Sequence, residues 1–333
     1  MAATLRDVAE MANVSIATVS MVVNNKADRI ADSTKKRVQE AIKTLGYSPN
    51  LQARWLQNQK SSILAILVPE LDNSFFSSLA QSAIVEAQKH GWMLSIFHLP
   101  SEEQQINSLK EKLSSGSFAG TLITSRKFEE LHRQIYKNRK VPYVLLDESV
   151  KTSKNQVLVT CDNYKGGYLL AEHLINNGHR KLACITGPED TPNSMRRLAG
   201  FIKRMNEESL VLESKNIVTG DYSLKSGYEM IQKLDLDNIT AIFAMNDLMA
   251  LGAMRYLIEK GYRIPEDISI VGYDNLDVSE YIFPRLTTID QHVDDLGREG
   301  VLALLDKIEG NERGFVKFIE PSLVKGGTVK KIN

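Results

Sequence analysis

The stretch TLRDVAEMANVSIATVSMVVNN, residues 4–25, decides the fold of the N-terminal part of the chain. Its apolar residues recur at helical spacing in two short runs, and Asn13 and Val14 between the runs supply a turn. Thr4 with an acid three residues later resembles a capping box, and Ser15 is a residue type that caps helices. The pattern therefore predicts two short helices joined by a tight turn.

A third helix is predicted over residues 32–45, where Val38 and Ala41 fall on one apolar face and Gly46 closes the helix. The periodicity stays helical up to about residue 58 and changes after Ser61 to short apolar runs. The chain therefore begins with an all-helical head.

The second helix of the head presents small or hydroxylated side chains outward, which is the geometry that places a helix in the DNA major groove. We expect Thr18 and Ser20 to donate to phosphate oxygens. The side chains expected to face base edges are Ile16, Ala17 and Met21. The alternative is a three-helix packing module without DNA contacts.

The charge of the chain is zero overall but is unevenly distributed. Residues 1–60 hold 9 Lys and Arg against 5 Asp and Glu, and residues 61–333 hold 32 against 36. A small basic head on a larger acidic body is the pattern expected when only the head meets phosphate.

Two cysteines, Cys161 and Cys184, lie in apolar, strand-like surroundings, and their spacing favours neither a disulfide framework nor a zinc site. The N-terminus lacks a basic stretch followed by an apolar run, and no segment has the apolar length of a membrane span. We therefore expect a cytoplasmic protein with no cofactor.

After residue 61 the chain alternates between apolar runs and amphipathic stretches, beginning with a predicted strand over 63–68 and a helix over 75–90. Such alternation predicts a parallel sheet wrapped by helices. About ten strand-and-helix units exceed one open sheet, so we predict two doubly wound parallel sheets, each with its own core.

Polar residues follow the predicted strands, where ligands bind in doubly wound sheets. Carboxylates and amides suit paired hydroxyls, Arg clamps a ring, and aromatic faces cover the apolar side of a sugar. Arg197 is placed at the start of the helix that follows 181–186. The candidates for ligand contact are Asn73, Phe75, Phe76, Asp147, Glu148, Arg197, Asn246, Asp247, Asp274 and Gln291.

Structural alternatives exist for several of these residues. Asp247 is the residue type that caps a helix, and capping is the interpretation we favour for it. The aromatic pair at 75–76 could belong to the core, and Asp274 could be a turn residue. Arg197 could pair with a surface carboxylate.

The quoted stretch, with GYSPNLQARWL after it, resembles the lactose-repressor and galactose-repressor (LacI/GalR) family. The resemblance implies that the second helix reads the major groove and that residues 49–57 form a hinge helix on DNA. Leu56 would then wedge into the minor groove at the operator centre, which kinks the DNA. The candidate DNA-binding set is Thr4, Leu5, Ser15, Ile16, Ala17, Thr18, Ser20, Met21, Asn24, Asn50, Ala53, Arg54 and Leu56.

The motifs VGYDN, NDLMALGA, RLAGF and LTTIDQ resemble the effector domain that this family shares with periplasmic sugar receptors. The resemblance implies two periplasmic-binding-protein-like subdomains that close on a ligand. By motif position the ligand contacts are Phe75, Phe76, Asp147, Arg197, Asn246, Asp274 and Gln291. Glu148 stands at a position that is frequently basic in the family, so the particular sugar cannot be transferred.

The reading surface departs from the family pattern as well. Met21 stands where the family commonly has Arg, so all three reading positions are apolar and cannot make a bidentate guanine contact. We hypothesise that the head reads thymine methyl groups and DNA shape. Trp55 and Ala31 also depart from the usual small hinge residue and capping hydroxyl.

The predicted organisation is a helix-turn-helix domain at 1–48, a hinge and linker at 49–60, and an effector-binding and dimerisation domain at 61–333. Its N-subdomain takes in about 61–161 and 291–320, and its C-subdomain about 162–290 and 321–333. The predicted function is a repressor, bound as a homodimer to pseudopalindromic operator DNA and controlled by a small sugar-like effector.

Other functions stay open as alternatives. One is a regulator driven by a phosphorylated carrier protein, as in the family's catabolite-control members, and another is a stand-alone sugar receptor. An enzyme is disfavoured, because the chain has no phosphate-binding glycine motif, metal spacing or nucleophile with an assigned base. His173 and His179 are interpreted as helix-surface residues.

Overall fold

The computed structural model describes residues 3–23, 27, 30–47, 61–98, 103–115, 118–136, 141–148 and 156–332. The chain divides into two compact units, Met1–Ser61 and Ser62–Asn333, and each is described by itself. In the described residues no helix is long and apolar enough to cross a membrane.

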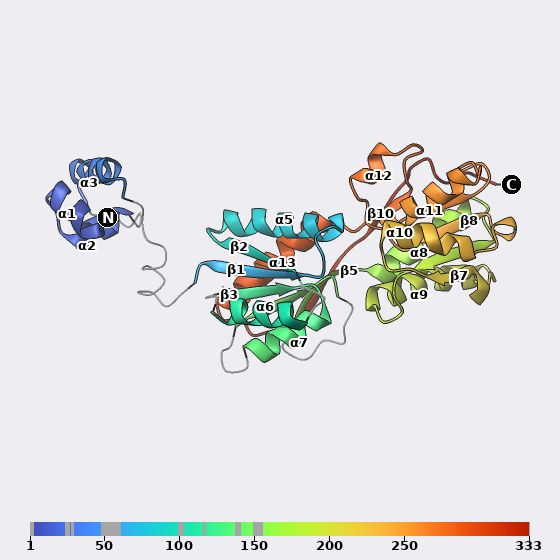
Figure 1. Cartoon of the computed structure of the whole chain (residues 1–333), viewed down its shortest axis with the longest axis horizontal. Helices are drawn as coiled ribbons and strands as arrows, with labels where there is room; N and C mark the ends of the chain where they lie inside the picture. The colour runs from blue at the N-terminus through green and yellow to red at the C-terminus, as the bar shows by residue number, and fades with distance from the viewer. Residues whose placement is uncertain are drawn as a thin grey trace. The chain divides into compact units, whose positions relative to one another are not determined.

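In its described residues the first unit contains three helices: α1 (Leu5–Ala12), α2 (Ile16–Val23) and α3 (Asp32–Leu45) (Figure 1). The predicted caps are confirmed. Thr4 forms a capping box with Asp7, and Ser15 Oγ accepts from the Thr18 amide at the start of α2. Val8, Val19 and Val38 are fully buried between the helices and form the centre of this small core.

The second unit contains two parallel sheets with helices on both faces, as the sequence predicts. The strand order of the first sheet is β11-β5-β4-β3-β1-β2. Its strands are β1 (Ile63–Val68), β2 (Met93–His98), β3 (Phe118–Ile123), β4 (Tyr143–Leu146), β5 (Val157–Cys161) and β11 (Phe315–Ile319). We call this sheet and its helices the N-subdomain.

Alternate residues of β1 pack against opposite helical layers, because successive side chains of a strand point to opposite faces. Leu64 and Ile66 share a core with α5 (Ser74–Lys89) and α13 (Val293–Ile308). Leu67 shares a second core with α6 (Glu103–Ser115) and α7 (Arg126–Ile135). Both faces are covered, which explains why β1 is a continuous apolar run.

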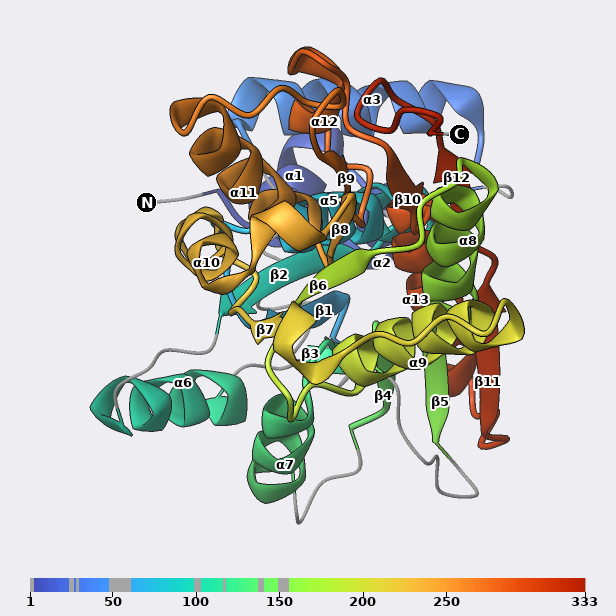
Figure 2. The same cartoon turned by 90° about the vertical axis from the view of Figure 1, so that its right-hand side faces the viewer.

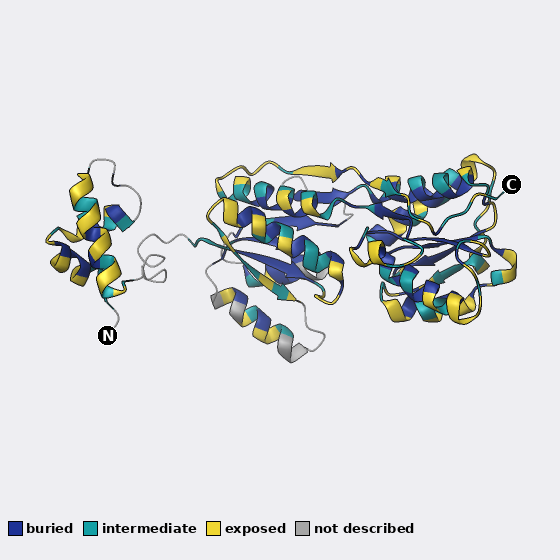
Figure 3. Cartoon of the chain, turned by 90° about the horizontal axis from the view of Figure 1, so that it is seen from above, coloured by how far each residue is buried: buried dark blue, intermediate teal, exposed yellow. Residues whose placement is uncertain are grey.

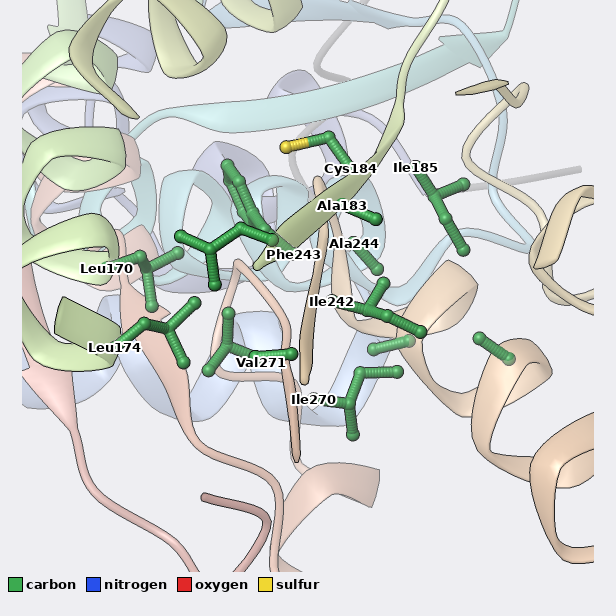
Figure 4. Packing of buried hydrophobic residues seen from close by; sticks show 14 of the residues in the cluster. Leu170, Leu174, Ala183, Cys184, Ile185, Ile242, Phe243, Ala244, Ile270 and Val271 are labelled. Atoms are coloured by element: carbon green, nitrogen blue, oxygen red, sulfur yellow. The ribbon is translucent and has the colours of Figure 1, made fainter. Parts of the chain in front are cut away.

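The second sheet has the strand order β7-β6-β8-β9 and, with its helices, forms the C-subdomain. Figure 4 shows side chains of β6, β8 and β9 packed together with Leu170 and Leu174 of α8. The strands are β6 (Leu182–Thr186), β7 (Ile217–Thr219), β8 (Ala241–Ala244) and β9 (Ser269–Val271). The helices are α8 (Asn163–Asn176), α9 (Pro192–Glu207), α10 (Leu224–Met230), α11 (Asp247–Glu259) and α12 (Val278–Tyr281), with 3-10 turns Ser214–Asn216, Ile231–Lys233 and Leu236–Asn238.

Helices α8 and α9 approach each other closely because glycines face the neighbouring backbone. A Cβ atom on Gly167 would lie 2.0 Å from the carbonyl oxygen of Arg197, and one on Gly200 would lie 1.8 Å from that of Tyr164. No side chain fits at such distances, so this pair of glycines fixes the position of α9 against α8.

The chain crosses between the subdomains three times, after β5, after β10 (Thr288–Asp290) and between β11 and β12 (Ser322–Val324). The crossings are hydrogen-bonded neighbours in two places. The Asp162 amide donates to the Ile319 carbonyl over 3.0 Å, and Asp290 pairs with Ser322 in the antiparallel β10-β12 ladder. This short ladder was not among the predicted elements.

Burial agrees with this layering (Figure 3). The inner strands of both sheets are buried, the edge strands β2, β7 and β11 are largely exposed or half-buried, and the helices combine buried and exposed residues. Cys161 and Cys184 are buried free thiols within β5 and β6. The interpretation of His179 as a helix-surface residue is wrong. It follows α8, is fully buried, and its ring lies 3.0 Å from the Thr240 hydroxyl and 3.1 Å from the Lys330 carbonyl.

Candidate functional site

Arg197 lies at the centre of a buried polar cluster between the ends of several strands. Its Nε donates to Asn163 Oδ1 over 2.7 Å, and its Nη1 donates to the Met245 carbonyl over 2.6 Å. The guanidinium carbon stacks 3.8 Å from the centre of the Tyr273 ring. The alternative in which Arg197 pairs with a surface carboxylate is wrong, because the side chain is buried.

The place of Arg197 in its helix is corrected as well. We predicted that it starts the helix after β6, but α9 begins at Pro192. Pro at the first position fits a helix start, because its missing N–H is one that a helix leaves unpaired there. Arg197 therefore lies in the second turn, where its side chain points into the protein and not towards the helix end.

Asp274 lies beside the guanidinium in a strained backbone position. Its Oδ1 is 3.7 Å from Arg197 Nη1 and accepts from Gln291 Nε2 over 2.6 Å. Burial raises the pKa of Asp274 well above its ordinary value, against the opposing field of Arg197. Its φ of 121° is rare for a residue with a side chain, and such strain gathers at functional sites.

The side-chain oxygen of Gln291, Oε1, is a buried acceptor that no described residue donates to. The side chain is 1% exposed, and Oε1 has no hydrogen-bond partner among the described residues. A buried acceptor without a partner costs free energy, so this atom favours a site that receives a donor from elsewhere.

Asp147, from the end of β4, faces the C-subdomain. Asn193 Nδ2 donates to both the carbonyl and the carboxylate of Asp147, over 2.7 and 3.1 Å. Burial raises the pKa of Asp147 to about 7, with Arg197 opposing the shift and Glu148 adding to it. The φ of Asp147 is 50°, a second left-handed position in the cluster.

A cavity of about 310 Å³ lies next to this cluster, between α5 and α13 of the N-subdomain and the loop after β9 of the C-subdomain. Phe75 and Asp274, two of the predicted ligand contacts, are part of its wall. Volumes from 300 Å³ upward are typical of small-molecule sites. The other wall residues are Ser74, Ser78, Asn275, Leu276, Asp277, Val278 and Val293.

Four of the candidates also stabilise the fold, as helix caps or through packing. Asn73 caps α5, since its Oδ1 accepts from the Phe75 amide over 3.1 Å. Phe75 is buried in the N-subdomain core, and Phe76 meets it edge to face at 5.3 Å. Asn246 caps α11 by accepting from the Met249 amide, and its Nδ2 donates to the Tyr222 carbonyl.

The prediction that Asp247 caps its helix is therefore wrong, because the preceding Asn246 is the cap. Asp247 is fully buried at the first helical position. Its carboxylate accepts from the Leu276 amide, the Ser279 hydroxyl and the Thr288 hydroxyl, over 2.8, 2.8 and 2.6 Å. It thus holds the loop after β9, which carries Asp274, and the start of β10, the strand that Gln291 follows.

The sequence reasoning missed Asn163, Asn193 and Tyr273, although all three lie in the cluster. Asn163 and Tyr273 follow β5 and β9 by two residues, so the rule that singled out the other candidates could have found them. Asn193 offered no comparable signal. No group of three or more His, Cys, Asp or Glu side chains in the described part of the chain could hold a metal ion.

In the first unit, α2 exposes an apolar face. Ile16 is 48% exposed and Met21 41%, and Ala17 between them is also exposed. Leu5, Thr18 and Ser20 are half-buried, whereas Thr4 and Ser15 are exposed caps. Five predicted DNA-contacting residues lie outside the described residues: Asn24, Asn50, Ala53, Arg54 and Leu56.

Known proteins resemble the chain over nearly its whole length. Residues 4–50 match the model of bacterial regulatory proteins of the lacI family, and residues 171–329 match the periplasmic binding protein-like domain. The HTH-type transcriptional repressor PurR of Mannheimia succiniciproducens is 32% identical over 335 residues, which cover 99% of both chains.

Solved structures agree. The lac repressor dimer bound to operator and the anti-inducer ONPF superposes with a TM-score of 0.86 and 30% identity, covering 99% of this chain and 100% of that one. A LacI family transcriptional regulator from Enterococcus faecium with bound ribose gives a TM-score of 0.72 at 30% identity, covering 81% of this chain and all of the other.

Proposed function

Because the chain belongs to the LacI family of bacterial regulatory proteins, we propose that it represses transcription from a pseudopalindromic operator and releases or tightens its hold when a sugar-like effector binds. The effector-binding part of this proposal is supported by one observation. The buried cluster of Arg197, Asp274 and Asp147 lies beside a cavity between the two subdomains. Convergent polar groups beside a cavity of this size are typical of ligand sites.

The chemistry of the cluster supports a ligand that donates several hydrogen bonds. The Arg197 guanidinium already serves Asn163 and Met245, and the Gln291 acceptor has no partner among the described residues. Burial raises the pKa of Asp147 and Asp274, and their carboxyl groups offer acceptor oxygens whether protonated or ionised. A molecule with paired hydroxyl groups supplies the donors that this set lacks, and the aromatic edge at Phe75 suits an apolar sugar face.

Effector and operator are coupled, we propose, through closure of the two subdomains. The N-subdomain would take in about 61–161 and 291–320, the C-subdomain about 162–290 and 321–333, with the head at 1–48 and the hinge at 49–60. The Asp147–Asn193 contact is made only when the subdomains are close, so a ligand that favours closure biases this equilibrium. Couplings of this kind amount to about 1–3 kcal/mol.

A homodimer fits the exposed apolar residues of the second unit. Val85, Met93 and Ile96 are exposed on α5 and β2, and Tyr281 and Phe283 are 85% and 96% exposed around α12. In Figure 2, α10 and α11 lie side by side at the left of this unit, and α12 lies above them. Large exposed apolar side chains occur at subunit interfaces. The dimer would act in the cytoplasm without catalysing a reaction.

The proposal is tested with the full-length protein in two steps. An operator is first selected from a random DNA pool. Thermal shift and operator-binding assays then follow with ribose, a hexose panel and the corresponding phosphates, since a bound ligand raises stability. We expect one neutral sugar to raise the melting temperature and to change operator affinity.

Variants make the result specific to the cluster. Arg197→Lys and Asp274→Asn should remove the response to the sugar while operator binding without sugar persists. Arg196→Ala is the matched control, because that neighbouring side chain is half exposed and lies 3.8 Å from Asp162 instead. An operator that no sugar modulates, but that a phosphorylated carrier protein does, would overturn the effector half of the proposal.

A further inference from the structure

The exposed face of α2 carries no group that can make a directed pair of hydrogen bonds to a base. The helix reads IATVSMVV and contains neither Arg, Lys, Asn nor Gln. Ile16 and Met21 are 48% and 41% exposed, and Ala17 is exposed beside them. Positions 16, 17 and 21 lie on one side of a helix because of its 3.6-residue repeat.

The hydroxyl groups near this face are tied to the start of the helix. Ser15 Oγ accepts from the Thr18 amide over 3.1 Å, and the two hydroxyl oxygens lie 2.8 Å apart. Ser20 is half-buried. The polar side-chain atoms of α2 thus make local contacts or are partly buried, and its most exposed side chains, Ile16, Ala17 and Met21, are apolar.

These facts exclude the commonest modes of direct readout from α2. Guanine is read by a bidentate Arg or Lys, and adenine by a bidentate Asn or Gln, whereas the apolar feature in the major groove is the C5 methyl group of thymine. We infer that α2 identifies its half-site through thymine methyl groups packed against Ile16, Ala17 and Met21. This inference rests on the proposed function, because it names the DNA chemistry that the repressor recognises.

Among the described residues of the head, the cations lie on helices other than α2. Arg6 is on α1, and Lys36, Arg37 and Lys43 are exposed on α3. Attraction of such side chains to phosphates supplies affinity without sequence information. The head therefore separates the two tasks, with affinity from charges on α1 and α3 and base identity from hydrocarbon on α2.

If α2 recognises the methyl group, another pyrimidine with a methyl group at C5 should be able to replace thymine. 5-Methylcytosine presents a methyl group at the same C5 position of a pyrimidine. A C·G pair in place of a contacted T·A pair should weaken binding, and methylation of that cytosine should restore part of the loss. Deoxyuridine differs from thymidine only by the missing methyl and pairs with adenine in the same way.

The test begins with operator selection by the full-length protein, followed by titration of selected operators in which single thymines are replaced by deoxyuridine. Burial of one methyl group corresponds to about a four-fold change in affinity. We expect about a four-fold weakening for each contacted thymine and more than ten-fold for a symmetric pair. Cytosine and 5-methylcytosine at the same position should differ by about four-fold in the same direction.

Variants connect the effect to α2. Met21→Leu should keep the deoxyuridine penalty, and Met21→Arg should remove it at one position and shift selection there towards guanine. Met11→Ala is the matched control, since this methionine is 51% exposed on α1. Circular dichroism verifies that each head is folded.

The outcomes separate the inference from the proposed function. A selected operator whose affinity does not change with deoxyuridine, or half-sites without thymine at the α2 contacts, overturns methyl reading and leaves the repressor intact. A protein that selects no sequence overturns the proposed function as well. Weakening by deoxyuridine together with recovery by 5-methylcytosine supports both.

Discussion

The side-chain amide of Asn193 donates to both the backbone carbonyl and the carboxylate of Asp147, over 2.7 and 3.1 Å, and so joins α9 of the C-subdomain to the end of β4 in the N-subdomain. Both groups are buried. The contact spans 46 residues of sequence and places a carboxyl group of raised pKa at the junction of the two subdomains.

Asp147→Asn should alter how stability depends on pH. Burial raises the pKa of Asp147 from 3.8 to about 7, so between these values the folded protein holds a proton that the unfolded chain has lost. The contribution of protonated Asp147 to the free energy of unfolding is complete below about pH 4, and it is lost as the pH rises through 7. Relative to the parent, Asp147→Asn should gain up to about 4 kcal/mol between pH 4 and 8. Urea unfolding at several pH values measures the difference.

The exposed Asp190 on the loop before α9 gives the control, Asp190→Asn. Its difference from the parent should stay nearly constant across the same range. A constant difference for Asp147→Asn would show that the carboxyl group is not held protonated in the folded protein.

Gly167→Ala should displace α9 and so disturb the contacts of Arg197 in the buried polar cluster. The added methyl would lie 2.0 Å from the Arg197 carbonyl oxygen, so α9 must move away from α8 and carry the guanidinium from its partners. We expect sugar binding to weaken at least ten-fold, or about 1.4 kcal/mol, while operator affinity without sugar stays within two-fold. Glu172→Ala on the same helix is the control. Calorimetry that gives equal sugar affinity for Gly167→Ala and the parent would refute the prediction.

Asp247→Ala should destabilise the protein far more than Asn246→Ala. Removal of the carboxylate leaves three buried donors without their acceptor, which costs about 3 kcal/mol or more. Loss of the Asn246 cap costs about 1–2 kcal/mol. Chemical denaturation of both variants measures the two losses, and the reverse order would mean that the Asp247 network contributes little.

His132 should make the protein less stable in mild acid. The imidazole is 3% exposed between the rings of Tyr136 and Tyr143, and burial lowers its pKa from 6.5 to about 4. The unfolded chain takes up a proton below pH 6.5 that the folded protein refuses until about pH 4. The contribution of neutral His132 to the free energy of unfolding is therefore complete above pH 6.5. It falls by up to about 3 kcal/mol as the pH drops to 4.

Replacement of this ring checks the assignment. His132→Phe keeps an aromatic ring between the two tyrosines and should flatten the decline in urea midpoint between pH 6.5 and 4. The exposed His98, changed to Gln, should leave the decline as it is. An equal decline in His132→Phe and the parent would assign the acid sensitivity to other groups.

The sequence predicted the elements well because their signals are local. Thr4 and Ser15 cap helices through residues three positions away, and the strand at 63–68 is an uninterrupted apolar run, so neighbours along the chain were enough. The same is true of the polar residues at strand ends, since the edge of a parallel sheet is set by topology.

The partners of those residues depend on contacts that no local pattern contains. Asp247 was interpreted as a cap, yet its carboxylate bonds Thr288, which is 41 residues away. Asn193 reaches Asp147 over a similar separation, and His179 is buried by the C-terminal segment at Lys330. The glycine contact that sets the depth of α9 is likewise visible only when both helices are in place.

The three adjacent crossings between the subdomains limit how these can move. Each crossing alone would permit rotation about several axes, but the hydrogen bond from Asp162 to Ile319 and the pairing of Asp290 with Ser322 oblige neighbouring segments to bend together. These two links restrict the rotations that the subdomains can make relative to each other. If an effector closes the subdomains as proposed, little conformational entropy would be lost on closure, and most of its binding energy would be available to choose between the open and closed arrangements.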